Sequence, residues 1–211
     1  MAETNVAGFG ERQHRDQKKT LWCYAACCQM IGVQNAGQSH NQCWFATIVA
    51  NPVGTPENEK LNCCNNDDIL KPRCLESADT AILVDSIRVT ATAKPILPGN
   101  QDHIYNLLVR EVGHNRLVSF GVHASPTNYG HSIIGFGHKT VQNQRWVHVY
   151  DPENGGSVEW IKYPSGEPKY NDIEDLRIHH RIPVPEAVHH PHPVVPEAVH
   201  HPYVAIKEVV V

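Results

Sequence analysis

The sequence predicts an α+β fold, in which a helical N-terminal half packs on a C-terminal antiparallel β-sheet. The first part of the chain holds apolar runs free of Gly and Pro, whereas short, alternating or turn-bounded apolar runs dominate from residue 86 on. Helices first and antiparallel strands second are typical of the α+β class. The chain has 211 residues, 41% of them hydrophobic and 19% charged, which suits one soluble globular core. We expect that domain to cover residues 1–182 and a tail to cover residues 183–211.

Two helices are expected near the N-terminus. Residues 21–31 contain no Gly or Pro and read as an apolar, mostly buried helix that ends near residue 32, with Thr20 as its N-cap. A second helix is expected at residues 40–50, with Ser39 as its N-cap.

The remaining elements follow from shorter patterns. Further helical segments are expected at residues 67–70, 75–83 and 102–112, the last capped by Asn100 or Gln101. Strands are expected at residues 86–92, 117–123, 132–137, 145–150, 157–163 and 175–182.

Cys23 falls in the first turn of the first expected helix. Unpaired backbone N–H groups and the positive end of the helix dipole favour an anion there, as a reactive thiolate requires. The alternative is a small buried apolar residue, the commoner role of a cysteine in a helix.

Gln17 lies six residues before Cys23 in a polar loop. Its side-chain amide and the Cys23 backbone N–H would together form a two-donor oxyanion hole. The alternative is a solvated loop glutamine, which the many charges around it favour.

His131 and Asp151 complete a candidate triad. His131 follows a Pro/Asn/Gly turn and opens an apolar run, where a loop-borne base would be supported by a sheet. Asp151 ends the next expected strand just before Pro152, within reach of His131 in an antiparallel pair, although an Asp before Pro is usually a turn residue. We assign His148, inside that strand, to a solvent or cross-strand face.

The order of these motifs resembles the papain-like cysteine proteases. More narrowly, it is similar to a compact bacterial group that includes the avirulence-type effector proteases of plant pathogens, with Gln, five residues, Cys-Trp-Ala-Ala, then Gly-His and an Asp-Pro on the next strand. The resemblance spans roughly residues 12–180. It implies Cys23 as nucleophile, His131 as base, Asp151 as its orienter and Gln17 as oxyanion donor, in a cleft between the two halves. Tyr24 replaces the usual Trp, a change that bears on packing under the site.

Charge and composition narrow the partners. The net charge is −4, and no basic run occurs beyond residues 12–19, which argues against nucleic acid as the main partner. No stretch approaches the roughly 18 to 20 apolar residues of a membrane span. We expect a monomer that acts on a peptide or protein substrate, with no cofactor and no metal.

Apart from Cys23, six cysteines remain, an even number that suits three disulfides with 15 possible connectivities. We expect the Cys63-Cys64 loop to be tethered to the helix that carries Cys27 or Cys28. The alternatives are free thiols and a structural zinc site, although the spacing lacks paired Cys-x2-Cys motifs. Disulfides require an oxidising compartment, while the N-terminus has no basic start or apolar h-region of a Sec-type signal peptide. We therefore expect secretion by another route or a cropped mature form, with cytoplasmic reduced thiols as the alternative.

The tail holds a direct repeat rich in Pro and His, with a period of 11 residues, in which residues 184–191 recur as residues 195–202. Such a segment buries too little surface to fold alone, so it should be extended or disordered. Its role is a spacer or, alternatively, weak metal binding through its histidines. The final apolar residues, 203–211, are β-prone and suited to strand addition.

Together these patterns predict a cysteine peptidase, a secreted hydrolase that works through a Cys23 thioester. A deamidase or acyltransferase would use the same triad on another acyl acceptor or leaving group. A non-enzymatic binding module, stapled by disulfides or zinc and with a structural Cys23, is the alternative from a different class.

Overall fold

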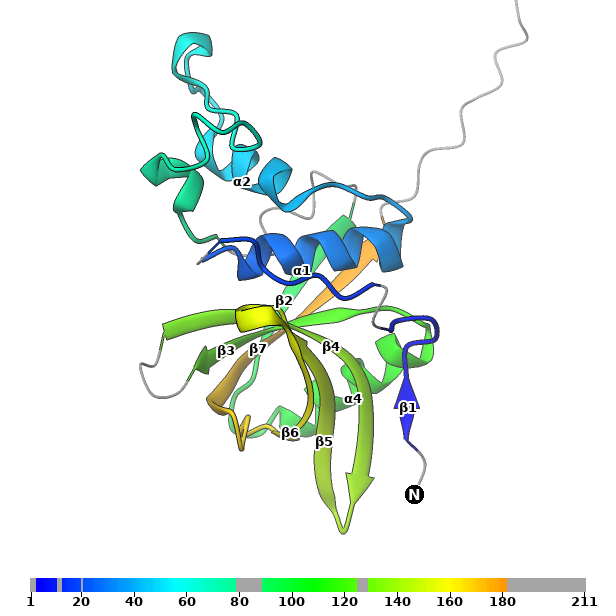
Figure 1. Cartoon of the computed structure of the whole chain (residues 1–211). Coiled ribbons are helices and arrows are strands. Elements are labelled where there is room, and N and C mark those ends of the chain that lie inside the picture. Colours follow the sequence, from blue (N-terminus) through cyan, green and yellow to red (C-terminus); the bar gives the residue numbers. More distant parts are fainter. Residues whose placement is uncertain (1–2, 11–12, 20, 79–88, 125–128, 182–211) are drawn as a thin grey trace, which may run out of the picture.

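The computed structural model describes residues 3–10, 13–19, 21–78, 89–124 and 129–181 (Figure 1). Within this part of the chain, three α-helices and a seven-stranded antiparallel sheet make an α+β fold, which confirms the predicted class. None of the described helices is long and apolar enough to cross a bilayer. The predicted tail from residue 183 lies outside the described residues.

The sheet follows the order β2-β7-β3-β4-β5-β6, and every pairing in it is antiparallel. Its strands are β2 (Val89–Pro95), β3 (Val118–Ala124), β4 (Tyr129–Val141), β5 (Gln144–Asp151), β6 (Ser157–Tyr163) and β7 (Tyr170–Arg181). The short β1 (Thr4–Asn5) pairs with the far half of β4, beyond the reach of β3. Each predicted strand overlaps one of these, and residues 86–88 of the first prediction lie outside the described residues.

Strand β7 is longer than predicted, because it begins at Tyr170 instead of residue 175. Its pairing with β3 contains register shifts at Gly121/Val122 and His123/Ala124. Such bulges place extra residues in a strand without breaking the ladder, and they obscure the alternation that reveals a strand in sequence. The first residues of β7 were therefore not predicted. The short β1 was not predicted either, and β4 extends beyond the predicted residues 132–137, from Tyr129 to Val141.

The first two helices begin later than predicted. Helix α1 (Cys23–Ile31) has Trp22 at its N-cap position and continues as a π-helix (Gly32–Ala36). Helix α2 (Gln42–Ala50) has Asn41 at its N-cap position, so Ser39 is not the cap. Thr20, the cap predicted for the first helix, lies outside the described residues, and Leu21 takes a left-handed conformation with φ 75° that a helix does not allow.

Helix α4 (Gln101–Gly113) agrees with the prediction, with Asn100 at its N-cap position. The Asn100 side chain bonds the preceding turn instead of the helix: its Nδ2 donates to the Pro95 carbonyl and its Oδ1 accepts from the Leu97 N–H. The cap residue therefore fixes the connection from β2 to α4.

Two disulfides hold the segment between α2 and β2, and the predicted pattern of three is wrong. The bonds join Cys43 to Cys64 and Cys63 to Cys74, so these cysteines are not zinc ligands. The anchor of the Cys63-Cys64 loop is Cys43 on α2 and not Cys27 or Cys28, both of which are buried thiols in α1. The reason is orientation: Cys27 faces β4, where its Sγ lies 3.4 Å from the Ser132 carbonyl oxygen.

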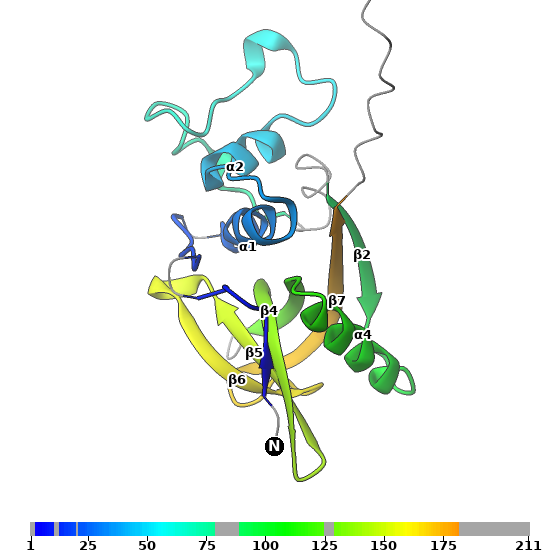
Figure 2. The same ribbon diagram turned by 90° about the vertical axis from the view of Figure 1, so that its right-hand side faces the viewer.

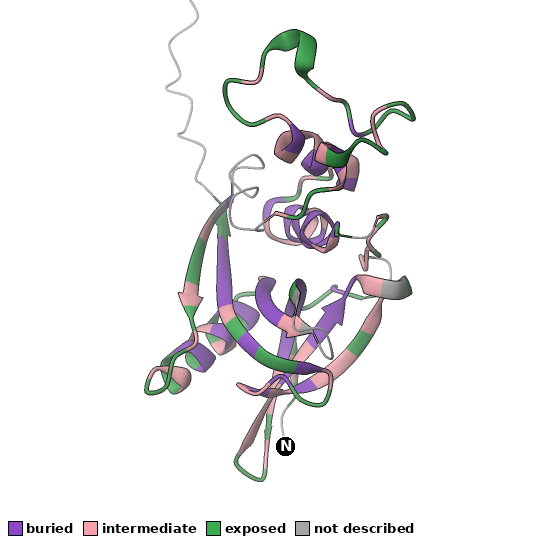
Figure 3. Cartoon of the chain, turned by 90° about the vertical axis from the view of Figure 1, so that its left-hand side faces the viewer, coloured by how far each residue is buried: buried purple, intermediate pink, exposed green. Residues whose placement is uncertain are grey.

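The disulfide-bonded segment contains little regular structure. It has two short 3-10 helices (Glu57–Glu59 and Pro72–Leu75) and is largely exposed to solvent (Figure 3). Residues 67–70 form turns, so the helix predicted there is wrong. The Asn65 side chain accepts a hydrogen bond from the Asp68 N–H, which favours a turn over a helix. Of the helix predicted at residues 75–83, only the end of a 3-10 turn is seen, and residues 79–83 lie outside the described part.

Helix α1 lies between α2 and the sheet, as both side views show (Figures 1 and 2). It is buried on nearly all sides, with Tyr24, Met30 and Ile31 almost without exposure. Helix α4 packs against β3, β4 and β7. The chain therefore forms a layered core, and α1 delivers its first residue to the boundary between helices and sheet.

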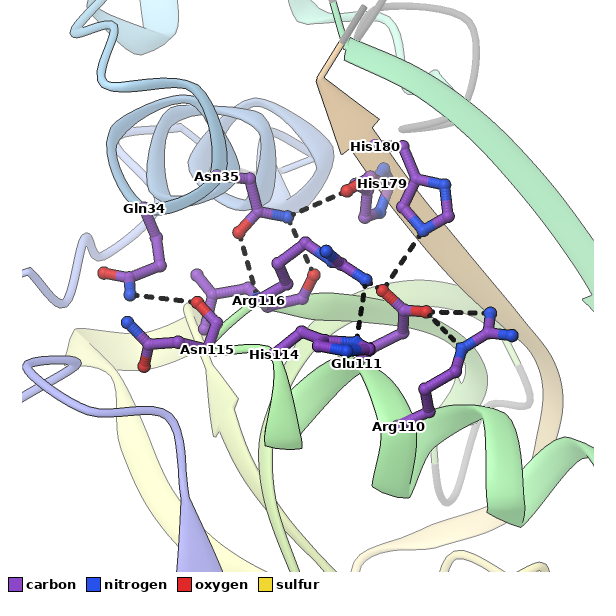
Figure 4. A network of polar contacts seen from close by, with 10 residues as sticks. Gln34, Asn35, Arg110, Glu111, His114, Asn115, Arg116, His179 and His180 are labelled. Atoms are coloured by element: carbon purple, nitrogen blue, oxygen red, sulfur yellow. Dashed lines mark hydrogen bonds and ion pairs between the residues drawn. The ribbon is translucent and has the colours of Figure 1, made fainter.

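A buried carboxylate joins α4 to β7. Glu111 is 1% exposed, and it accepts hydrogen bonds from Arg110, Arg116 and His180 (Figure 4). Burial opposes the charged carboxylate, yet the hydrogen bonds from Arg116 and Arg110 outweigh it and hold the pKa of Glu111 below its ordinary value. Nearby, Asn35 of the π-helix bonds the Leu117 backbone and so ties the helical layer to β3.

We expect Glu111→Ala to lower the free energy of unfolding by about 2 kcal/mol, since it removes charge-assisted hydrogen bonds at a buried position. Urea unfolding near neutral pH measures the loss. The pKa of Glu111 is lower in the folded protein, so its contribution to the free energy of unfolding is present above the ordinary carboxyl pKa. The difference in stability between wild type and Glu111→Ala should therefore shrink as the pH falls through the folded pKa. Glu57→Ala, which removes an exposed ion pair with Lys60, is the control and should leave stability unchanged. Equal stability of both variants would contradict the role given to Glu111.

Candidate active site

Cys23 is the first residue of α1 and is partly exposed. The left-handed Leu21 turns the chain sharply, and the buried Trp22 then anchors it by donating its indole N–H to the Cys74 carbonyl, 2.8 Å away. The free N–H groups of a first helical turn surround a thiol in this position and favour its anion. The local sequence thus places the Cys23 side chain at the N-terminus of a helix.

His131 and Asp151 share the sheet face that α1 covers. Tyr150 pairs with Ile134, so Asp151 lies opposite Ile133 and on the same face as His131, two residues away on β4. The His131 Nε2 lies 2.7 Å from the Asp151 Oδ1, and both side chains are buried. The pairing predicted from strand order is therefore present as a direct hydrogen bond.

The Cys23 side chain lies close enough to the His131 ring to influence its ionisation. Burial favours the neutral ring, but the interactions with Asp151 and Cys23 outweigh it and raise the pKa of His131 to about 10. The imidazole is therefore held as a cation beside the thiol, between the helix start and a carboxylate.

Asp151 accepts four hydrogen bonds, two on each oxygen. Oδ1 receives them from His131 Nε2 and the Glu153 N–H at 2.9 Å, while Oδ2 receives them from Tyr170 Oη at 2.8 Å and Lys169 Nζ at 2.7 Å. Burial opposes the charge, but the His131 and Lys169 contacts dominate and hold the pKa of Asp151 well below its ordinary range. The carboxylate is thus ionised and fixed in orientation.

Gln17 reaches the same region through its backbone. Its N–H donates to the Pro152 carbonyl at 2.8 Å, which sets it beside the turn that follows Asp151. Its Oε1 is buried without a hydrogen-bond partner, and no partner for its Nε2 occurs among the described residues. An amide whose N–H groups are unused is available to a ligand.

The same cluster has the donor types of a metal site. Ligand atoms of His131, Asp151 and Glu153 lie within 4.8 Å of one another. However, His131 Nε2 and Asp151 Oδ1 bond each other, and the Lys169 ammonium bonds the other carboxylate oxygen. A metal cation would have to displace one cation and sit beside another, so hydrogen bonding explains the cluster better.

Two other residues singled out in the sequence are His148 on β5 and Tyr24, which follows Cys23 on α1. The His148 ring stacks on Trp160 of the neighbouring strand, with the ring centroids 4.2 Å apart. It also forms a hydrogen bond with the Asn5 side chain, which confirms its cross-strand position. Burial lowers the pKa of His148 to about 4, so its ring is neutral near pH 7. Tyr24 is fully buried in α1, and its hydroxyl has no partner among the described residues.

Sequence reasoning missed Lys169 and Tyr170. Both precede the strand predicted at residue 175, in a segment rich in Pro, Gly and charge that reads as a loop. Lys169 also bonds Glu159 and Ser157 of β6, which makes it a bridge between the Asp151 carboxylate and the sheet edge. The one available signal was indirect: a buried Asp151 carboxylate needs several hydrogen-bond donors, so donors other than His131 had to lie near it.

No protein-family model matches the chain, and no curated protein matches it either. The chemistry of the site therefore has to be argued from its own geometry.

We expect the stabilisation from His131 to fade as the pH rises. The pKa of His131 is about 10 in the folded protein, above its ordinary value of 6.5. Its contribution to the free energy of unfolding is therefore complete below pH 6.5 and is lost as the pH rises towards 10. The difference in melting temperature between wild type and His131→Gln should shrink between about pH 6 and about pH 10. His103→Gln, at an exposed position on α4, is the control and should show no such trend. A difference in melting temperature that grows with pH would mean that His131 and Asp151 do not form an ion pair.

Proposed function

We propose that the protein is a cysteine peptidase that hydrolyses peptide bonds through a thioester at Cys23. The observation that carries the proposal is the buried His131–Asp151 hydrogen bond, 2.7 Å long, with Cys23 at the N-terminus of α1 beside the His131 ring. A nucleophile next to a base that a third group orients is the arrangement expected of nucleophilic catalysis. The helical layer on an antiparallel sheet is compatible with a papain-like architecture and a cleft between the halves.

In this mechanism the Cys23 thiolate attacks the scissile carbonyl carbon. The oxyanion accepts hydrogen bonds from the Cys23 N–H and the Gln17 Nε2, and His131 gives its proton to the leaving amine as the C–N bond breaks. A water that His131 deprotonates then attacks the thioester carbon, and the C–S bond breaks to release the acid product and restore the Cys23 thiolate beside the protonated His131. Asp151 holds the imidazole in place throughout and needs no proton of its own.

The alternatives differ in how well they explain the buried charges. A binding module has no need for an ionised Asp–His pair beside a thiol, and burying such a pair costs solvation energy. A deamidase or acyltransferase uses the same groups and differs in leaving group or acceptor, so product analysis separates it from a peptidase. A peptide or protein substrate, a monomeric state and secretion remain parts of this proposal, and the two disulfides favour an oxidising compartment.

The test compares wild type with triad variants on a proteome-derived peptide library, read by mass spectrometry. We expect Cys23→Ala and His131→Ala to abolish cleavage, because nucleophile and base are lost, and Asp151→Ala to leave detectable activity. Iodoacetamide near pH 6 should alkylate Cys23 rapidly and spare the buried Cys27 and Cys28. Cleavage that survives Cys23→Ala would refute the proposal. Peptides in which a side-chain amide has become an acid, with no new peptide termini, would favour a deamidase.

We expect Gln17→Ala to lower kcat by roughly 10² to 10³, the usual loss for one oxyanion donor, with little effect on thermal unfolding. Steady-state kinetics on the best-cleaved peptide measure it. Gln13→Ala, in the same polar segment, is the matched control and should stay close to wild type. An unchanged kcat in Gln17→Ala would remove Gln17 from the oxyanion hole.

A further inference from the structure

Gln42 is a buried amide in an unusual position. It is the first residue of α2 and only 3% exposed, yet its side chain leaves the helix and reaches the N-terminal loop. Its Nε2 donates to the Asp16 carbonyl at 2.7 Å, and its Oε1 accepts from the Lys18 N–H at 2.8 Å. One side chain thus bonds the backbone on both sides of Gln17.

This bridge fixes the backbone at Gln17. The Gln17 N–H is bonded on the opposite side to Pro152, the residue after Asp151. The Asp16 carboxylate in turn accepts a hydrogen bond from the Tyr150 hydroxyl. The backbone around Gln17 is therefore held by α2 on one side and by the end of β5 on the other.

The anchor of the bridge is itself rigid. Cys43, the neighbour of Gln42 on α2, is disulfide-bonded to Cys64. Gln29 of α1 also lies beside the Gln42 amide, but its Oε1 is 3.4 Å from Nε2, a contact too long to contribute much to the anchor. An oxyanion donor has to be held within a fraction of an ångström, because a misplacement of about 1 Å can cost on the order of 10²-fold in rate.

We propose that Gln42 is a positioning residue that sets the Gln17 amide in the oxyanion hole, an inference that rests on the proposed peptidase activity. Both ends of its amide are required: the N–H for Asp16 and the oxygen for Lys18. Met has a similar length but neither group, while Glu keeps the acceptor and replaces the donor by an oxygen that faces a carbonyl.

The experiment is a double-mutant cycle on the best-cleaved peptide. We expect Gln42→Met and Gln42→Glu each to lower kcat at least about tenfold with KM within about twofold. In a Gln17→Ala background, Gln42→Met should cost less than about twofold, because the group it positions is gone. Gln29→Met is the matched control, since it removes only the long contact to Gln42, and should stay within about twofold of wild type. Equal losses from Gln42→Met in both backgrounds, or an unchanged kcat, would overturn the inference.

A second measurement tests the Gln42 contacts without relying on peptidase activity. It therefore still gives an answer if the protein is not a peptidase or if a Gln42 variant folds poorly. If wild type shows no Cys23-dependent cleavage, the peptidase proposal fails, and amide hydrogen exchange by NMR then decides on the bridge. Gln42→Glu, which keeps the acceptor, should leave the Lys18 amide protected, while Gln42→Met should speed its exchange at least about tenfold. Equal Lys18 exchange in wild type and Gln42→Met would show that the bridge holds nothing, and would overturn the inference on its own.

Discussion

The strand ends around the candidate site depend on the buried carboxylate of Asp151. A charge removed from water costs several kcal/mol unless its lone pairs are all taken, and here four donors take them. These donors come from β4, from the turn after β5 and from the start of β7, so satisfying one charge fixes three strand ends at once. His131 is one of the four. The same requirement that stabilises the sheet therefore holds the imidazole in one orientation.

The strands could be predicted from sequence because their pattern is local. Residues 117–123 and 145–150 alternate or run apolar between turn residues, and the structure shifts the first strand by one residue and lengthens the second by one residue at each end. The start of α1 could not be predicted, because it depends on the left-handed Leu21, a conformation with no signature in that residue type. Cys23, His131 and Asp151 were identifiable by residue type and order, whereas Lys169 and Gln42 act through contacts that join distant parts of the chain.

The cysteines show why an even count does not predict connectivity. Six cysteines besides Cys23 suit three bonds, yet Cys27 and Cys28 are directed inward by a helix that is buried nearly all round. A buried thiol at such a position acts as a small apolar side chain. The four cysteines that do pair lie in a segment with few apolar contacts of its own, where covalent links replace a hydrophobic core. The disulfides therefore stiffen the outer layer and leave the thiol at the start of α1 unpaired.

The three candidate groups of the site come from three separate supports. The thiol belongs to α1 and the imidazole to β4, while the Gln17 amide belongs to a loop that touches both layers, through Gln42 and through Pro152. A shift of the helical layer against the sheet would change the Cys23–His131 contact and strain the loop at the same time. Since a hydrogen bond weakens steeply with distance and angle, such a shift is resisted by every bond that crosses the boundary. The position of Gln17 therefore depends on both layers, because its loop is bonded to α2 through Gln42 and to the turn after β5 through Pro152.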